Sequence, residues 1–576
     1  MSQDRYGSDL IVDLFKLYEI DYAALNPGST FRGLHDSIVN YGGNWMPQMI
    51  TCNHEEIAVG VAHGYAKATG RAMAAIVHDV VGLLHGTFSM YYAYLDRVPV
   101  IVVGGCGAMS VPKRRRIDWI HNATLQGNAI RDYVKWDDQP FTVESIPESF
   151  ARAYRIAMTE PHGPVYICFE MPFQEMKLQV EVPLPNKERL KVPPPILGDL
   201  SSIRRVAEML VAANNPVIIA DYLGRHPASF DQLVTLAETT GAAVIDLNSR
   251  LNFPTGHPLC LTGSEILREA DLVVALDVRD LYDNFVEIDR ESGDHKPILS
   301  PKAKIVDIGF GDLEISKWAH DYQRLQEVDL QVLGDTRAVL PYLVEYCQGL
   351  ARGKESLIQQ RFSHHSRTSS ALRRQWMEEA KQNWDSRPIS TARLASEIWQ
   401  VIKDEDWVLT ANTLNDWTRR IWSFTRPEQH PGKSLGTGTQ FGLSLGIALA
   451  HRGSGKLVVD IQPDGDLLFD GGALWTATHE QIPMLVVMYN NRGYYNDWGH
   501  QIRLAKQRGN PVERAAIGME IDHPPPDFAR LAQAFGWYAE GPIENPEEIG
   551  PALKRALAVL KKEGRPALID TVTQYR

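Results

Sequence analysis

Short apolar segments recur along the chain, and longer segments with the spacing of amphipathic helices separate them. This alternation predicts parallel sheets covered by helices, because parallel neighbours in a sheet must be joined by a long crossover connection. The apolar segments fall into three sets, and each set spans roughly 150–190 residues, a usual size for one domain. The expected strands are 22–28, 73–80, 98–105 and 163–171, then 215–222, 242–248, 270–277 and 303–310, and finally 406–412, 457–464, 483–491 and 565–573.

The segments between these sets indicate where the domains meet. The chain has 576 residues, which is too long for one hydrophobic core. We predict an α/β fold with three doubly wound parallel-sheet domains, at residues 1–181, 196–350 and 389–576. Residues 183–195 are polar and rich in proline, which predicts an extended connector. Residues 351–388 are highly charged and contain no strand-like segment, so we expect a linker with helical pieces on the surface.

Composition argues against several classes of protein. The net charge of −12 disfavours a general nucleic-acid-binding protein, and the basic residues 113–116 form either a solvated loop or a site for substrate phosphates. No run of about 18 apolar residues occurs, so we expect no membrane span, and the first residues lack the pattern of a signal peptide. The cysteines are scattered and odd in number, which favours buried thiols and the cytoplasm: Cys52, Cys106, Cys168, Cys260 and Cys347.

Polar residues follow two expected strands of the third set. Strand 457–464 ends at Asp464, which Gly465 follows, and strand 483–491 ends at Asn491, two residues before Gly493. The carboxyl ends of parallel strands form the crevice in which α/β proteins bind ligands. A hard divalent cation prefers carboxylate and amide oxygens, and a glycine at a helix start lets backbone amides approach phosphate oxygens. The pattern therefore predicts a site for a metal ion and a phosphate.

These residues resemble the cofactor motif of thiamine-diphosphate-dependent enzymes, in which GDG is followed at a distance by NN. Asp464 and Asn491 are 491 − 464 = 27 positions apart. The resemblance implies that thiamine diphosphate is bound with Mg²⁺, and that Asp464, Asn491 and the carbonyl of Gly493 are the metal ligands. The first glycine of the motif is Pro463 here, and this departure leaves the metal ligands intact.

Other cofactor contacts follow from the same resemblance. Gly465, Asp466 and Asn491 would lie at the diphosphate, although relatives carry serine or alanine where this chain has Asp466. Asn412 and Thr413 follow strand 406–412 and would hold the diphosphate too. Segment 434–450 aligns with the one that carries a bulky residue beneath the cofactor, and that position falls on Thr439. The resemblance makes the three domains pyrimidine-binding, central and diphosphate-binding, in that order.

The first domain contains a second part of the resemblance. The sequence HEEIAVGVAHGYAKATG, residues 54–70, is similar to a segment of pyruvate decarboxylase, benzoylformate decarboxylase and acetolactate synthase. Alignment on GYAKATG places Glu55, and not Glu56, at the glutamate that protonates the aminopyrimidine ring of the cofactor in that family. The cofactor performs the chemistry, and the protein supplies position and electrostatics. The plainer interpretation of Glu55 is a carboxylate that complements the dipole of a helix.

Two residues of the first domain point to the substrate. The sequence NPGS ends strand 22–28, and it resembles the stretch of benzoylformate decarboxylase whose serine, Ser29 here, contacts the substrate carboxylate. His78 aligns with the proton-relay histidine of the same family, and histidine suits proton exchange because it titrates near neutral pH. Acetolactate synthases usually lack a histidine there. The simpler interpretation of His85, seven residues further on, is a structural role.

The leading functional hypothesis is a 2-oxo-acid decarboxylase or carboligase similar to benzoylformate decarboxylase. The alternatives are an acetolactate-synthase-like transferase, a 2-hydroxyacyl-CoA lyase and a non-catalytic protein on the same fold. No expected strand is followed by GxGxxG, which argues against a nicotinamide enzyme, and the central domain could bind ADP or CoA. We expect a 2-oxo acid, aldehyde or acyl-CoA as substrate, and the resemblance implies a homodimer or homotetramer. Segment 492–512 would cover the substrate, as it does in relatives.

Overall fold

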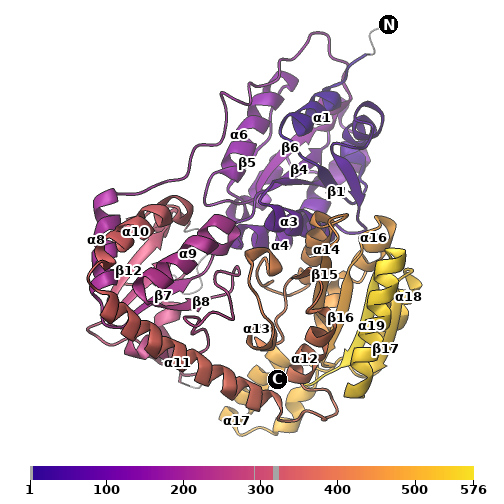
Figure 1. Ribbon diagram of the computed structural model, residues 1–576. Coiled ribbons are helices and arrows are strands. Elements are labelled where there is room, and N and C mark those ends of the chain that lie inside the picture. The colour runs from indigo at the N-terminus through magenta and orange to yellow at the C-terminus, as the bar shows by residue number, and fades with distance from the viewer. Residues whose placement is uncertain (1–3, 291, 315–323, 576) are drawn as a thin grey trace.

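The computed structural model describes residues 4–290, 292–314 and 324–575. Three α/β bodies surround the centre of the molecule in Figure 1, with the N-terminal one at the top, the central one at the left and the C-terminal one at the right. Each body contains one parallel sheet with helices on its faces. The predicted fold class is therefore confirmed, and each expected strand segment contains a strand.

The first domain is built on a six-stranded parallel sheet with the order β2-β1-β3-β4-β6-β5. Helices α1 (Gly7–Leu17) and α6 (Ile146–Met158) contribute to the core on one face. Helices α3 (Glu55–Thr69) and α4 (Asp79–Leu95) bury side chains on the other face. The strands are β1 (Tyr22–Leu25), β2 (Gln48–Thr51), β3 (Met73–His78), β4 (Val100–Cys106), β5 (Trp136–Asp138) and β6 (Val165–Glu170).

The central domain has a five-stranded parallel sheet with the order β13-β12-β9-β7-β8. Helices α8 (Leu200–Ala212), α9 (Pro227–Thr240) and α10 (Thr336–Ala351) pack against it. A short antiparallel pair, β10 (Val286–Ile288) with β11 (His295–Pro297), was not predicted. The strands of the main sheet are β7 (Pro216–Ala220), β8 (Ala243–Asp246), β9 (Leu272–Leu276), β12 (Lys304–Gly309) and β13 (Leu330–Leu333).

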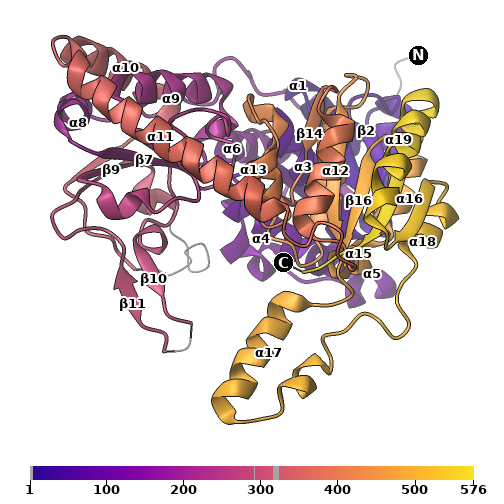
Figure 2. The same ribbon diagram turned by 60° about the horizontal axis from the view of Figure 1, so that its bottom comes forward.

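The third domain repeats this plan with the strand order β14-β15-β16-β18-β17. The strands are β14 (Trp407–Leu409), β15 (Leu457–Pro463), β16 (Leu485–Asn490), β17 (Tyr538–Ile543) and β18 (Ala567–Val572). The helices that flank them are α12 (Thr391–Ile402), α14 (Gln440–Ala450), α16 (Ala473–His479), α18 (Phe528–Ala534) and α19 (Pro546–Glu563). Helix α17 (Tyr495–Arg508) buries none of its side chains and projects from the body of the domain (Figure 2).

The two predicted joints have different structures. Residues 179–199 form no helix or strand, as an extended proline-rich connector should. The charged segment 351–388, expected as a linker with helical pieces, contains one 26-residue helix, α11 (Glu355–Ala380), which crosses from the central to the third domain (Figures 1 and 2). Arg361 fixes this helix, because its guanidinium donates to the backbone carbonyls of Leu210, Val211 and Thr240.

Helices α3 and α14 join the first domain to the third at very close range. A Cβ atom on Gly64 would lie 1.9 Å from the carbonyl oxygen of Leu443, and one on Gly446 would lie 2.1 Å from that of Val61. Only glycine permits this approach, because the clash would be with backbone. The contact fixes the start of α3 relative to the carboxyl edge of the third sheet.

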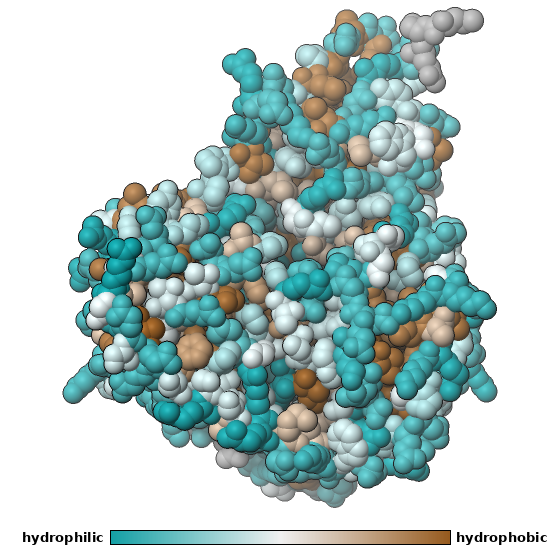
Figure 3. All heavy atoms as spheres, viewed as in Figure 1, coloured by the Kyte–Doolittle hydropathy of each residue, from teal (hydrophilic) through white to brown (hydrophobic). Residues whose placement is uncertain are grey.

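The surface has an ordinary polar character. The face in Figure 3 is largely hydrophilic, and its hydrophobic side chains lie in small separate groups. Residues 113–116 are exposed, as expected of a solvated loop, and the five cysteines are buried and free. Among the described helices, none has the length and apolar character that a membrane span requires.

Candidate functional site

The three predicted metal ligands come together at the carboxyl edge of the third sheet. Asp464 is the first residue of α15 (Asp464–Asp470), directly after β15, and Asn491 follows β16. The backbone N–H of Gly493 donates to Oδ2 of Asp464 (3.2 Å) and to Oδ1 of Asn491 (3.1 Å). Arg492 turns the chain with φ of 58°, which places Gly493 against these two oxygens.

The electrostatics of this group fit a divalent cation. Asp464 is 2% exposed, and burial raises the pKa of its carboxyl to about 6. No lysine or arginine among the described residues forms an ion pair with it. Carboxylate, amide and carbonyl oxygens are the donors that Mg²⁺ takes in proteins. Asp464, Asn491 and Gly493 would therefore hold Mg²⁺, whose charge favours the ionised form of Asp464.

Asp466 contacts the loop that precedes α14. Its Oδ1 accepts the N–H of Gly438 (2.6 Å), and its Oδ2 accepts the N–H of Gln440 (3.2 Å). Residues 436, 437 and 438 all have positive φ (76°, 58° and 88°), which the glycines at 436 and 438 adopt without strain, so Asp466 binds a loop whose shape the two glycines permit. Thr439 is buried at the end of this loop, where its hydroxyl donates to the carbonyl of Gly436 (2.9 Å). A direct contact of Asp466 or Thr439 with the cofactor stays a prediction.

The remaining predicted cofactor residues lie at the same sheet edge. Oδ1 of Asn412 accepts the N–H of Leu414 (2.7 Å), and the hydroxyl of Thr413 donates to Asp416 (3.3 Å). Both follow β14, the neighbour of β15. Gly465 lies under the ring of Tyr494, since a Cβ atom there would be 2.6 Å from a ring carbon. With Asn491, the residues expected at the diphosphate thus follow three adjacent strands, β14, β15 and β16.

Glu55 begins α3 and is 4% exposed. Its Oε1 accepts the amide N–H of Asn26 (3.1 Å), and its Oε2 lies 3.1 Å from Nδ1 of His85. This second contact joins α3 to α4, and the sequence interpretation of His85 as a structural residue missed it. Burial and the charge of Asp466 raise the pKa of the neighbouring Glu56 to about 7, so Glu56 lies within electrostatic reach of the third domain.

The predicted substrate residues meet at the ends of β1 and β3. Ser29 is exposed and follows Gly28, whose backbone packs on His78: a Cβ atom at Gly28 would lie 2.3 Å from that of His78. Nδ1 of His78 is 2.9 Å from the hydroxyl of Thr30. The sheet order places β1 beside β3, so the NPGS turn and His78 share one edge.

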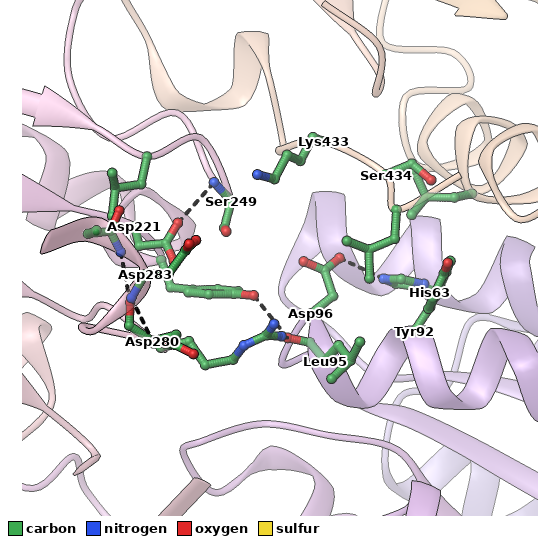
Figure 4. A pocket seen from close by; sticks show the side chains of 16 residues that line it. His63, Tyr92, Leu95, Asp96, Asp221, Ser249, Asp280, Asp283, Lys433 and Ser434 are labelled. Atoms are coloured by element: carbon green, nitrogen blue, oxygen red, sulfur yellow. Dashed lines mark hydrogen bonds and ion pairs between the residues drawn. The ribbon is translucent and has the colours of Figure 1, made fainter. Parts of the chain in front are cut away.

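A separate cavity of about 200 Å³ lies where the three domains meet (Figure 4). Oδ1 of Asp221 accepts the N–H of Ser249 (3.1 Å), and the hydroxyl of Tyr222 donates to the carbonyl of Leu95 (2.9 Å). Lys433 enters from the third domain. Side chains of both charges line the cavity, with Arg279 and Lys433 beside four carboxylates: Asp96, Asp221, Asp280 and Asp283.

Comparison with known proteins agrees with this geometry. Three domain families match, described as the N-terminal TPP binding domain (residues 5–124), the central domain (203–343) and the C-terminal TPP binding domain (412–571) of thiamine pyrophosphate enzymes. The sequence is 26% identical, over 98% of this chain and 91% of the relative, to a probable acetolactate synthase large subunit of Methanocaldococcus jannaschii. It is 24% identical, over 92% of this chain and 88% of the relative, to the acetolactate synthase isozyme 3 large subunit of Escherichia coli.

Solved structures give the same fold. The crystal structure of benzoylformate decarboxylase from Polynucleobacter necessarius superposes with a TM-score of 0.76 at 18% identity, and the match covers 99% of both chains. A putative thiamin diphosphate-dependent enzyme from Mycobacterium smegmatis also gives 0.76, at 20% identity over 99% of this chain and 100% of the other. The domain matches, together with the site geometry, show that this chain belongs to the thiamine-pyrophosphate-dependent enzymes.

Proposed function

We propose that the protein is a thiamine-diphosphate- and Mg²⁺-dependent lyase that decarboxylates a 2-oxo acid. The observation that carries this proposal is the meeting of Asp464 and Asn491 on one backbone N–H, that of Gly493, while the carboxylate of Asp464 forms no ion pair with a lysine or arginine among the described residues. When bound, thiamine diphosphate would supply a carbon nucleophile for the substrate carbonyl and an electron sink for the broken carbon–carbon bond. The protein has to bind and orient the substrate and the cofactor, and it has to exchange protons with them.

Glu55 is the proposed proton donor to the cofactor ring. Its carboxyl is buried, and Asn26 and His85 fix one oxygen each. A buried ionised carboxylate is costly unless it is hydrogen-bonded, so these two contacts keep the group at this position in either protonation state.

Ser29 and His78 form the proposed substrate end of the site. Ser29 offers a hydroxyl donor to the carboxylate of the substrate, and His78 exchanges a proton with the reacting carbon after decarboxylation. Thr30 holds Nδ1 of His78, which fixes the ring orientation. Protonation at that carbon releases an aldehyde, whereas attack on a second carbonyl gives a carboligation product.

An acetolactate-synthase-like transferase is the second candidate, because the sequence relatives above are acetolactate synthase large subunits. His78 favours the decarboxylase, since a positioned acid promotes aldehyde release. A 2-hydroxyacyl-CoA lyase is a further alternative, which would need a site for the nucleotide of its substrate. The cavity of Figure 4 is lined by both basic and acidic side chains.

We also propose a homodimer or homotetramer in which a second copy covers the site. Exposed hydrophobic side chains flank the candidate residues on two elements. Leu84 and Phe88 lie on α4 beside His85, and Leu468 and Phe469 lie on α15 just after Asp466. Burying these side chains against another copy would stabilise the assembly.

Asp464→Ala tests the proposed function. It removes the only charged ligand proposed for the metal, so titration calorimetry should detect no Mg²⁺-dependent binding of thiamine diphosphate. Asp497→Ala, an exposed position on α17, is the matched control and should bind as the wild type does. Wild-type affinity in Asp464→Ala would refute the metal site. A panel of 2-oxo acids, with aldehyde and carboligation products quantified, then separates the two candidate reactions.

A further inference from the structure

A smaller cavity, of about 80 Å³, lies where α11, the loop of residues 255–263 and α13 (Trp417–Ile421) meet. Helix α11 passes beside α13 in both ribbon views (Figures 1 and 2). The central domain, the linker helix and the third domain therefore all contribute to this cavity. It shares no lining residue with the cavity of Figure 4, and it lies on neither α4 nor α15, the elements that the proposed second copy covers.

Three arginine side chains line this cavity, and two of them have no acidic partner among the described residues. Arg373 of α11 donates through Nη2 to two backbone carbonyls of the loop 255–263 (2.9 and 3.2 Å). Arg420 of α13 forms neither a hydrogen bond nor an ion pair within the described chain. Its guanidinium lies over the rings of Trp417 (4.9 Å to the centroid) and Trp376 (5.7 Å), which fixes its orientation.

The third arginine, Arg419, has an acidic partner. Oδ2 of Asp246 lies 3.0 Å from its Nη2, whereas its buried Nε has no hydrogen-bond partner among the described residues. The lining contains one carboxylate, that of Asp416. Since Asp246 compensates Arg419, the charges of Arg373 and Arg420 outweigh that of Asp416, and the cavity attracts an anion.

The size and the remaining lining of the cavity indicate which kind of anion fits. A guanidinium group binds a carboxylate through two parallel N–H donors. Leu372 and Trp376 give the lining an apolar part, against which a hydrocarbon group can pack. Water takes about 30 Å³ per molecule in the liquid, so about 80 Å³ has room for a short carboxylate and none for a nucleotide.

The cavity is also connected to the turn expected at the diphosphate. Asp416 precedes α13 and accepts the hydroxyl of Thr413 (3.3 Å), and the backbone carbonyl of Thr413 accepts the N–H of Thr418 (3.2 Å). Residues 414, 415 and 416 are not glycines, yet all three have left-handed φ (50°, 52° and 69°). Such a backbone is strained and keeps its shape only where its surroundings hold it. A ligand that contacts α13 through Arg420 adds to the contacts that hold this turn.

We propose that this cavity binds a small organic carboxylate, and that its occupation stabilises the turn 412–416 and so favours the binding of thiamine diphosphate. The carboxylate accepts N–H bonds from Arg373 and Arg420, and its hydrocarbon part lies against Trp376. By linkage, the cofactor raises the affinity for the carboxylate by the same factor. The coupling rests on the proposed function, in which this turn holds the diphosphate, whereas the site for the carboxylate does not.

The first test measures the binding of propanoate to the whole chain without cofactor, by saturation-transfer NMR. Propanamide has the same shape without the charge and should not bind. Arg420→Gln should weaken the binding of propanoate at least about 10-fold, because a hydrogen bond between charged groups is stronger than a neutral one. Arg420 has no hydrogen bond to lose within the described chain, so the unfolding temperature should not change. Arg374→Gln, at an exposed position next to Arg373, is the matched control and should bind as the wild type does.

Three outcomes of this test would overturn the site. One is equal affinity for propanoate in the wild type and in Arg420→Gln. Another is loss of binding in Ser29→Ala, because propanoate would then occupy the proposed substrate end of the active site. The third is binding of inorganic phosphate without binding of propanoate, which would exclude an organic carboxylate as the ligand.

The second test measures the coupling by calorimetry of thiamine diphosphate with Mg²⁺, with and without saturating propanoate. Propanoate should raise the affinity of the wild type for the cofactor at least about 5-fold, and it should have no effect on Arg420→Gln. Propanoate that binds in the cavity and leaves the cofactor affinity unchanged would overturn the coupling. A wild type that binds no thiamine diphosphate would refute the proposed function and the coupling with it, while Arg420-dependent binding of propanoate would still support the site.

Discussion

The carboxylates at the two junctions of the first domain differ in the charges that surround them. At the junction with the central domain, arginine and lysine side chains outweigh the effect of burial and lower the pKa of three carboxyls: Asp96, Glu160 and Asp277. On the side of the third domain, burial raises the pKa of five carboxyls: Glu56, Asp460, Asp464, Asp466 and Asp470.

The difference separates a structural contact from the proposed binding site. Oδ1 of Asp96 lies 2.6 Å from Nη1 of Arg250, and its Oδ2 lies 2.7 Å from Nζ of Lys67 and 2.7 Å from Nε2 of His63. The charge of Asp96 is therefore compensated within the chain. Four buried acids of the third domain form no ion pair with a lysine or arginine among the described residues: Asp460, Asp464, Asp466 and Asp470. A divalent cation would compensate Asp464, the only charged ligand of the proposed magnesium site.

The largest expected effect is a loss of stability at the junction of the first and central domains, where basic side chains compensate the carboxylates. Asp96→Asn removes one negative charge from among three basic side chains, and Arg250 and Lys67 stay buried. Breaking a buried ion pair from one side costs about 3–5 kcal/mol, and urea unfolding followed by tryptophan fluorescence should detect that loss. Glu148→Gln breaks the exposed pair with Arg152 and should cost less than about 1 kcal/mol. Equal effects of the two substitutions would contradict the distinction between the junctions.

The next effect concerns the helix contact that positions the proposed site. Gly64→Ala places a Cβ atom 1.9 Å from the carbonyl oxygen of Leu443, so α3 and α14 must separate. Overpacking of this kind costs about 1–3 kcal/mol, and the shift of α3 should also weaken cofactor binding measured by calorimetry. Gly349→Ala is the matched control, because no atom lies within 4 Å of a Cβ in that part of α10. It should be neutral or stabilise by up to about 1 kcal/mol, and a similar loss in both variants would contradict the close-packing argument.

Much of the fold could be predicted because the central strands are buried on both faces. β16, LVVMYN, is buried along its whole length and is therefore apolar almost throughout. The short strands β2 and β5 lie at the sheet edges and are mostly half-buried, so their sequences carry little of this signal. The linker was predicted to contain helical pieces on the surface. Its high charge gives no local sign of one continuous helix, and α11 is held by the bonds of Arg361 to distant backbone carbonyls.

The residues of the candidate site also divide into those that a local sequence pattern predicts and those that depend on tertiary packing. Asp464 and Asn491 could be found because each follows a strand, and parallel strands bring such ends together. The contact of His85 with Glu55 spans 30 positions and depends on how α4 packs against α3, which leaves no local pattern. Asp466 was predicted at the diphosphate from the motif, and its two bonds to the loop before α14 needed the three-dimensional structure.

The smallest expected effect is a dependence of stability on pH, which tests the difference between the two junctions. Asp460 is fully buried in β15, where Gln440 (3.0 Å) and Thr410 (3.1 Å) donate to its Oδ1, yet burial raises its pKa from 3.8 to about 7. At pH values between about 4 and about 7, folding therefore takes up a proton at Asp460. This carboxyl makes the wild type less stable as the pH rises through that range. Asp460→Asn cannot ionise, and its stability relative to the wild type should increase by at least about 1 kcal/mol between pH 4.5 and pH 8, measured by urea unfolding. Asp497→Asn, exposed on α17, should show no such trend. A constant difference between Asp460→Asn and the wild type would mean that the buried acids of the third domain are compensated as Asp96 is.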